Sequence, residues 1–117
     1  MGDYDTTSKD PMLNDFGGLG VRMALHTGDP GGANSALNEV SGGGYARQTV
    51  SWAVASGGTM ALAVSPVFFV PAVTITWASF WNAAGTVRYS KVLLAAAAIF
   101  GTAGTLTITA GTADLAL

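Results

Sequence analysis

Cysteine is absent from this chain of 117 residues, and charged residues are scarce. The lack of cysteine excludes disulfides, thiolate metal sites and a cysteine nucleophile. Charged residues make up only 10% of the chain, whereas an ordinary soluble domain has about 25%. A surface with so little charge promotes association between molecules. We therefore predict that much of this surface is covered by neighbouring molecules in a working assembly.

Positive charge in particular is too sparse for a surface that binds nucleic acid. The five Lys and Arg residues are scattered along the chain, and the formal net charge is −2, whereas nucleic-acid binding needs a basic patch. The longest apolar run, residues 92–100, is far shorter than the roughly 20 residues of a membrane-spanning helix. The N-terminus is acidic and polar, unlike the basic start of a signal peptide. We expect no nucleic-acid partner, no membrane partner and no signal peptide.

Short runs of β-branched and aromatic residues, separated by Gly, Pro and Asn turns, fill most of the chain. This pattern is typical of antiparallel all-β domains, and we expect an antiparallel β-sandwich that is jelly-roll-like. The alanine run 95–98 is expected to be a buried strand or turn rather than a helix. The expected strands cover residues 21–27, 45–53, 59–64, 67–70, 73–81, 87–94 and 106–109.

The N-terminal segment has a different composition from the rest of the chain. Residues 1–9 are rich in Asp, Thr and Ser without periodicity, and are expected to form a flexible arm. Asp10 is a favourable N-cap, Pro11 suits a first helical turn, and Gly17 and Gly18 favour a stop, so a short helix is expected after the arm. Residues 10–117 are expected to form a single β-sandwich domain.

Candidate catalytic and metal-binding residues are few. His26 is the only histidine, and a lone histidine without partners is more simply a hydrogen-bonded structural residue. Asp29, Asn34, Asn38 and Glu39 supply oxygens along one loop, which raises the possibility of calcium. Their spacing does not match a twelve-residue calcium loop, and Asp29 is more simply a turn residue. We expect no metal site.

Glycines are concentrated at residues 42–44, but they do not form a phosphate-binding motif. No lysine follows any glycine in the pattern of a P-loop, and no Gly-x-Ser-x-Gly elbow is present. These glycines favour tight turns or a close approach of the backbone to a neighbouring chain. We expect no catalytic residue, no cofactor and no enzymatic activity.

The aromatic residues are spaced as strand residues, and most are expected to lie in the core. Trp77 and Trp81 share one parity along the strand 73–81, whereas Phe80 has the opposite parity and is expected to face a partner subunit. An exposed aromatic platform that binds sugar is the alternative. The set comprises Trp52, Phe68, Phe69, Trp77, Phe80 and Trp81.

Two polar, glycine-rich segments carry a resemblance to a known group of proteins. Residues 24–34 (ALHTGDPGGAN) and 38–48 (NEVSGGGYARQ) resemble small virion proteins of actinobacterial siphophages, which are usually labelled tail fibre or minor tail proteins. The resemblance continues more weakly through residues 67–72 (VFFVPA), 80–83 (FWNA) and 106–111 (LTITAG). It implies a structural role in a virion and brings no catalytic motif.

The expected function is therefore that of a non-enzymatic structural protein of a tailed bacteriophage, made in the host cytoplasm and located in the virion. It would dock as a multicopy homo-oligomer on other virion proteins of the tail or baseplate. The alternatives are a capsid decoration protein on the major capsid protein and a module that binds host surface glycan. The candidate interface residues are His26, Asp29, Asn34, Glu39, Tyr45, Arg47, Phe80 and Trp81.

Overall fold

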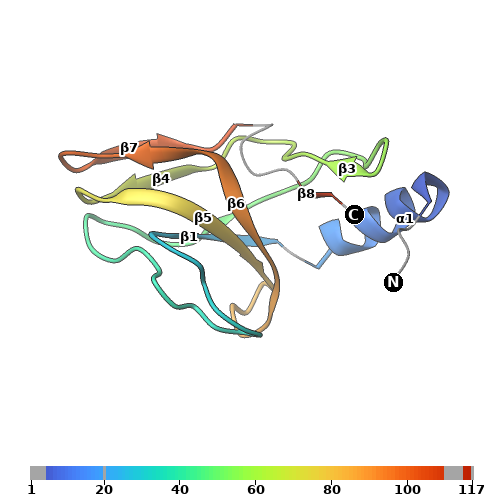
Figure 1. The fold of residues 1–117 in the computed structure, drawn as a ribbon, viewed down its shortest axis with the longest axis horizontal. Coiled ribbons are helices and arrows are strands. Elements are labelled where there is room, and N and C mark those ends of the chain that lie inside the picture. The colour runs from blue at the N-terminus through green and yellow to red at the C-terminus, as the bar shows by residue number, and fades with distance from the viewer. Residues whose placement is uncertain (1–4, 20, 110–114, 117) are drawn as a thin grey trace.

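Antiparallel strands and one N-terminal helix make up the fold of the computed structural model, which describes residues 5–19, 21–109 and 115–116 (Figure 1). The expected all-β sandwich with a short N-terminal helix is confirmed. The elements are α1 (Thr6–Gly17), β1 (Arg22–His26), β2 (Gln48–Thr49), β3 (Thr59–Met60), β4 (Val67–Val70), β5 (Thr74–Trp81), β6 (Arg88–Ile99), β7 (Gly104–Thr107) and β8 (Leu115–Ala116).

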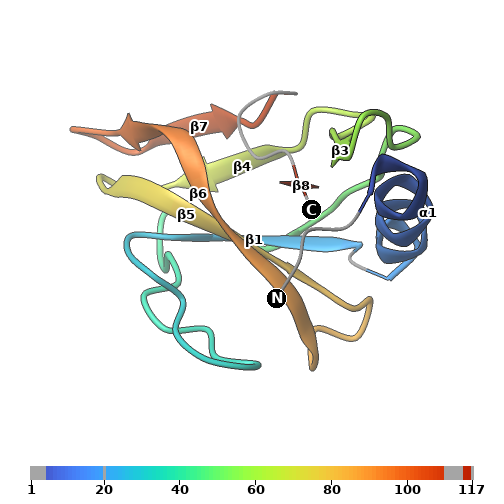
Figure 2. The ribbon, with the colours of Figure 1, turned by 45° about the vertical axis from the view of Figure 1, so that its right-hand side comes forward.

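The largest sheet has four strands in the order β2-β1-β5-β6, and all its described pairs are antiparallel. Met23 lies opposite Phe80 and Leu25 opposite Ala78 across β1 and β5. The β4-β7 pair lies on one side of this sheet, and a long loop lies on its other side (Figures 1 and 2). The β3-β8 pair lies toward α1, at the other end of a molecule that measures 44 × 25 × 25 Å.

The hydrophobic core fills the space between the four-stranded sheet and the β4-β7 pair. Phe68 and Val70 alternate with the exposed Val67 and Phe69 along β4, so one face of that strand is buried, as alternation in a half-covered strand predicts. From the four-stranded sheet the same core receives Met23, Leu25, Ile75, Ala78 and Phe80, none of which is exposed.

Helix α1 begins earlier than the sequence indicated. It starts at Thr6, where the carbonyl of Asp5 accepts hydrogen bonds from the backbone N–H groups of Ser8 and Lys9. Residues 6–9 are therefore helical rather than part of a flexible arm, and residues 1–4 lie outside the described residues. Asp10 is not the N-cap, because it lies inside the helix; its Oδ1 accepts a hydrogen bond from the backbone N–H of Gly58 at 2.8 Å. This contact with a turn 48 residues away anchors the helix.

Three other expectations need correction in detail. Of the expected strand 45–53, only Gln48–Thr49 pairs with β1, because the segment before it belongs to the long loop. Of the expected strand 59–64, only Thr59–Met60 pairs as a strand, with an isolated bridge between Trp52 and Leu62. Residues 95–98 are strand, as expected, but residues 95–97 are exposed rather than buried. They lie in an irregular stretch of β6 where the register with β5 shifts.

Among the described residues, the single α-helix has 12 residues and is neither long nor apolar enough to cross a membrane.

Candidate functional site

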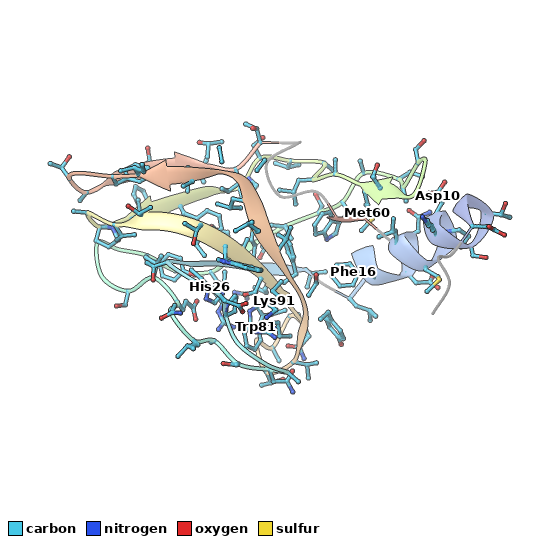
Figure 3. The ribbon with its side chains drawn as sticks, in the orientation of Figure 1. Asp10, Phe16, His26, Met60, Trp81 and Lys91 are labelled. Atoms are coloured by element: carbon cyan, nitrogen blue, oxygen red, sulfur yellow. The ribbon has the colours of Figure 1, made fainter. Side chains whose placement is uncertain are left out.

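The long loop of residues 27–47, called here the covering loop, packs on the outer face of the four-stranded sheet. Strands β1 and β5 are consequently buried on both faces, and β5 ends in four consecutive buried residues, 78–81. Met23 and Phe80 face the core, whereas Ala24 and Ser79 form a cross-strand pair on the outer face. Figure 3 shows His26, Trp81 and Lys91 gathered on this side of the sheet, away from Asp10 and Met60 at the helix end.

A chain of hydrogen bonds runs through the buried layer between the sheet and the covering loop. The indole N–H of Trp81 donates to Ser79 Oγ at 2.8 Å, and Ser79 Oγ lies 2.7 Å from His26 Nε2. On its other side, His26 Nδ1 lies 2.9 Å from the carbonyl oxygen of Leu37 in the covering loop. A carbonyl only accepts, so Nδ1 carries the imidazole proton, and Nε2 accepts the hydroxyl proton of Ser79. With the imidazole neutral, both ring nitrogens of His26, the Ser79 hydroxyl and the Trp81 indole N–H all have a hydrogen-bond partner.

Burial determines what this histidine can do. His26 and Ser79 are both fully buried, and burial lowers the pKa of His26 below its ordinary value of 6.5, although the Leu37 carbonyl and Glu39 act in the opposite direction. A serine and a histidine at 2.7 Å have the spacing of a nucleophile and its base. Here no substrate can reach Ser79 Oγ in the folded chain, because sheet and loop enclose it. The geometry therefore supports a structural role for the pair.

A second, half-buried group of side chains joins the covering loop to itself and to the sheet. Glu39 accepts two hydrogen bonds from Arg47, each 2.9 Å long, and one of 2.8 Å from the hydroxyl of Tyr45. The guanidinium carbon of Arg47 lies 4.1 Å from the centre of the Trp81 ring, a cation–π contact. The Tyr45 hydroxyl also accepts from the backbone N–H of Leu25 at 2.9 Å. The ion pair thus fixes the end of the covering loop over Trp81.

The pKa values of this group reflect its pairing. Burial alone raises the pKa of Glu39, but the hydrogen bonds from Arg47 and Tyr45 outweigh it, and the pKa is lowered from 4.5. Burial raises the pKa of Tyr45, and the hydrogen bond to Glu39 raises that of Arg47. All three side chains therefore keep their ordinary charge at neutral pH.

Arg88, at the start of β6, supplies the hydrogen-bond donors that the first half of the covering loop needs. Its guanidinium donates to the carbonyl oxygens of Ser35, Gly31 and Gly32 at 2.6, 2.8 and 2.6 Å. Its backbone N–H donates to Asn34 Oδ1 at 2.9 Å. An irregular loop has no strand partner for these carbonyls, so the fixed fork of guanidinium donors takes that place.

Lys91 makes the outermost connection between β6 and the covering loop. Its Nζ lies 2.6 Å from Asp29 Oδ1, donates to the Gly31 carbonyl at 3.1 Å, and lies 5.6 Å from the centre of the Trp77 ring. The hydrogen bond from Lys91 lowers the pKa of Asp29, which is exposed. An exposed pair of this kind contributes little stability, but it fixes the direction of the loop tip.

The loop needs backbone conformations that few residues adopt. Asn34 and Asn38 have φ angles of 58° and 61°, in the left-handed region that asparagine tolerates. Gly43 has a φ of 63°, and a Cβ atom there would lie 2.5 Å from the backbone nitrogen of Pro71. The glycine-rich turn therefore approaches the backbone at the end of β4 of the same chain, whereas the sequence predicted a tight turn or an approach to a neighbouring chain.

The oxygens that raised the possibility of calcium have other partners. Asp29 pairs with Lys91, Asn34 with the backbone of Arg88, and Glu39 with Arg47. Asn38 uses its amide nitrogen to donate to the Asp29 carbonyl at 3.2 Å. Within the described residues there is no group of three or more His, Cys, Asp or Glu side chains that could hold a metal ion.

The structure brings most of the expected interface residues together, but it turns several of them inward. His26 and Phe80 are fully buried and Trp81 is 3% exposed, so these three cannot contact a partner from the folded chain. For Phe80 the expectation failed because both faces of β5 are covered, and parity then does not separate inside from outside. Sequence reasoning missed Ser79, Arg88 and Lys91, since their partners lie more than 50 residues away in the chain.

Comparison with known proteins links the chain to a protein family. Residues 19–116 match the family model described as podophage GP4 fiber I protein gp80. The match supports a phage fibre protein, as the sequence resemblance implied, but it points to a podophage family where the resemblance pointed to actinobacterial siphophages. No curated protein and no solved structure gives a significant match. The matched range includes the covering loop and begins after α1.

Proposed function

This chain belongs to the podophage GP4 fiber I protein gp80 family, and on that basis we propose that it is a non-enzymatic structural protein of a tailed-phage virion. It docks in many copies as part of a tail fibre, against its own copies and against other virion proteins. The observation that carries the proposal is the match over residues 19–116, which spans nearly the whole sandwich and the covering loop.

The geometry of the covering loop supports a structural role. Its polar side chains are bound to one another, to backbone carbonyls and to β6, and the Ser79–His26 pair is closed to solvent. Within the described residues, no buried side-chain nitrogen or oxygen lacks a hydrogen-bond partner. Such a network holds one surface shape and leaves no reactive group in reach of a substrate.

The alternative of a glycan-binding module receives less support. A sugar platform needs aromatic faces that are open to solvent, whereas Trp81 is 3% exposed and Arg47 lies over its ring. Trp77 and Trp52 are half-buried, and Lys91 lies beside the Trp77 ring. Among the described residues the most exposed large aromatic side chain is that of Phe69, which carries no polar group for a sugar hydroxyl.

The proposal is tested on purified virions. Labelling with an antibody against this chain, viewed by electron microscopy, should mark the tail, and quantitative mass spectrometry should give a handful to tens of copies for each particle. Label distributed over the head with hundreds of copies would replace the tail-fibre role with capsid decoration. Absence of the chain from purified particles would refute a virion role altogether.

A further inference from the structure

Formal charge is confined to part of this molecule. No Asp, Glu, Lys or Arg occurs in residues 48–87 or 92–113. In the described structure the charged side chains therefore belong to Asp5 and α1, to β1, to the covering loop and to the first residues of β6. Strands β4 and β7 carry none, and they lie on the side of the main sheet opposite the covering loop (Figures 1 and 2).

The outward side chains of β4 and β7 form a small uncharged surface, called here the charge-free face. Val67 and Phe69 are 48% and 58% exposed on β4. Val67 lies opposite Thr107 and Phe69 opposite Thr105, and both threonines are exposed. Cross-strand partners share one face of a sheet, so these four side chains point the same way. Among the described residues β7 pairs only with β4, so its other edge is open as well.

Because the charge-free face carries no charged group, it favours a partner surface that is also uncharged. A charged group pressed against it would lose water and find no opposite charge, which is costly. A matching surface must therefore be uncharged and partly apolar, with hydroxyls that pair with threonine. Natural sheets protect open edges with charge or proline, but residues 104–107 contain neither. An edge without such protection is typical of one that is covered in the assembled state.

We propose that the charge-free face is the surface through which one copy of this chain packs on a second copy. This inference rests on the proposed multicopy role in a fibre. In a twofold dimer the same surface of both copies forms the interface, so an uncharged face meets another uncharged face. A stable interface needs about 800 Å² from each partner, a small part of the 5982 Å² surface of the chain. The contact must therefore extend beyond the four side chains onto the surface around them.

The test is sedimentation velocity of the full chain over a range of concentrations. The wild-type chain should associate, and Phe69→Lys should raise its dissociation constant by about tenfold or more, since truncating or charging a central contact costs over 1 kcal/mol. The matched control is Val54→Lys, which adds the same charge at a side chain that is 82% exposed but lies between β2 and β3. The control should associate as the wild type does.

Two further measurements keep the outcome decisive. Far-UV circular dichroism shows whether Phe69→Lys is folded, and Thr105→Lys places the same charge on the neighbouring strand if it is not. A wild-type chain that stays monomeric, or a Val54→Lys variant that weakens association equally, overturns the proposal. Either result leaves the virion role intact, because that role is decided by labelling of particles. Absence from particles refutes the virion role but does not affect the result of sedimentation.

Discussion

Replacing Ser79 with alanine is the sharpest test of the buried layer beneath the covering loop. The hydroxyl accepts a hydrogen bond from Trp81 Nε1 at 2.8 Å and lies 2.7 Å from His26 Nε2, to which it donates. Ser79→Ala removes this hydroxyl, so it leaves both the Trp81 N–H donor and the His26 Nε2 acceptor without a partner. Neither can turn to water, because His26 is fully buried and Trp81 is 3% exposed.

The expected loss of stability follows from these two groups. Each buried polar group left without a partner costs about 1–3 kcal/mol, so the variant should lose about 2–6 kcal/mol of unfolding free energy. A domain of this size has about 5–15 kcal/mol in total, so the loss is a large fraction of it. The change in side-chain volume is small and adds little to this loss.

Urea unfolding at neutral pH, followed by far-UV circular dichroism, measures the effect. The matched control is Ser41→Ala, which alters an exposed serine in the covering loop and should change the unfolding free energy by less than about 0.5 kcal/mol. A loss in Ser79→Ala of under about 1 kcal/mol would refute the reasoning. It would mean that water or a rearranged side chain satisfies His26 and Trp81.

Three further predictions concern other parts of the molecule. The folded chain binds a proton on His26 less readily than the unfolded chain does, so wild-type unfolding free energy should fall as the pH drops below about 6.5. In His26→Gln this slope should vanish above the range where carboxylates titrate; an unchanged slope in urea titrations would contradict it. Gly43→Ala places a Cβ 2.5 Å from a backbone nitrogen, whereas Gly42→Ala has a similar positive φ with nothing within 4 Å. The first should lower the thermal midpoint far more than the second, and equal losses would argue against the close approach. Phe68→Ala should cost about 3–5 kcal/mol in urea unfolding, whereas its exposed neighbour Phe69→Ala should cost under about 1 kcal/mol; equal costs would contradict the one-sided burial of β4.

Local pattern predicted the regular strands well because local chemistry determines them. The expected strand 67–70 has the same bounds in the structure, and the Asn82–Gly85 turn closes with a hydrogen bond of 2.9 Å from the Gly85 N–H to the Asn82 carbonyl. The start of α1 was predicted too late, because aspartate is a residue type that favours the N-cap. The Asp10 side chain instead makes a tertiary hydrogen bond with the backbone of Gly58. No local signal distinguishes these two roles of an aspartate.

The covering loop shows where prediction from sequence had to stop. The order of its residues resembled that of phage fibre proteins, and its glycines and asparagines indicated the turns that it makes. Its packing on the outer face of β1 and β5 was not predicted, because a polar loop between strands normally lies in water. The residues that hold it, Ser79, Arg88 and Lys91, are ordinary strand residues until the fold places them opposite it.

The sequence by itself determined the class of the fold, the class of protein and the absence of cysteine chemistry. These follow from the alternation of apolar and polar residues, from turn residues, from composition and from short sequence motifs, all of which can be read locally along the chain. Only the tertiary structure decided which faces of the strands are covered. That depends on contacts such as His26 with Ser79, which are 53 residues apart, and the energy of such contacts exists only once the sheet has formed. The same packing buries Phe68 and Val70 and leaves Val67 and Phe69 of β4 facing outward.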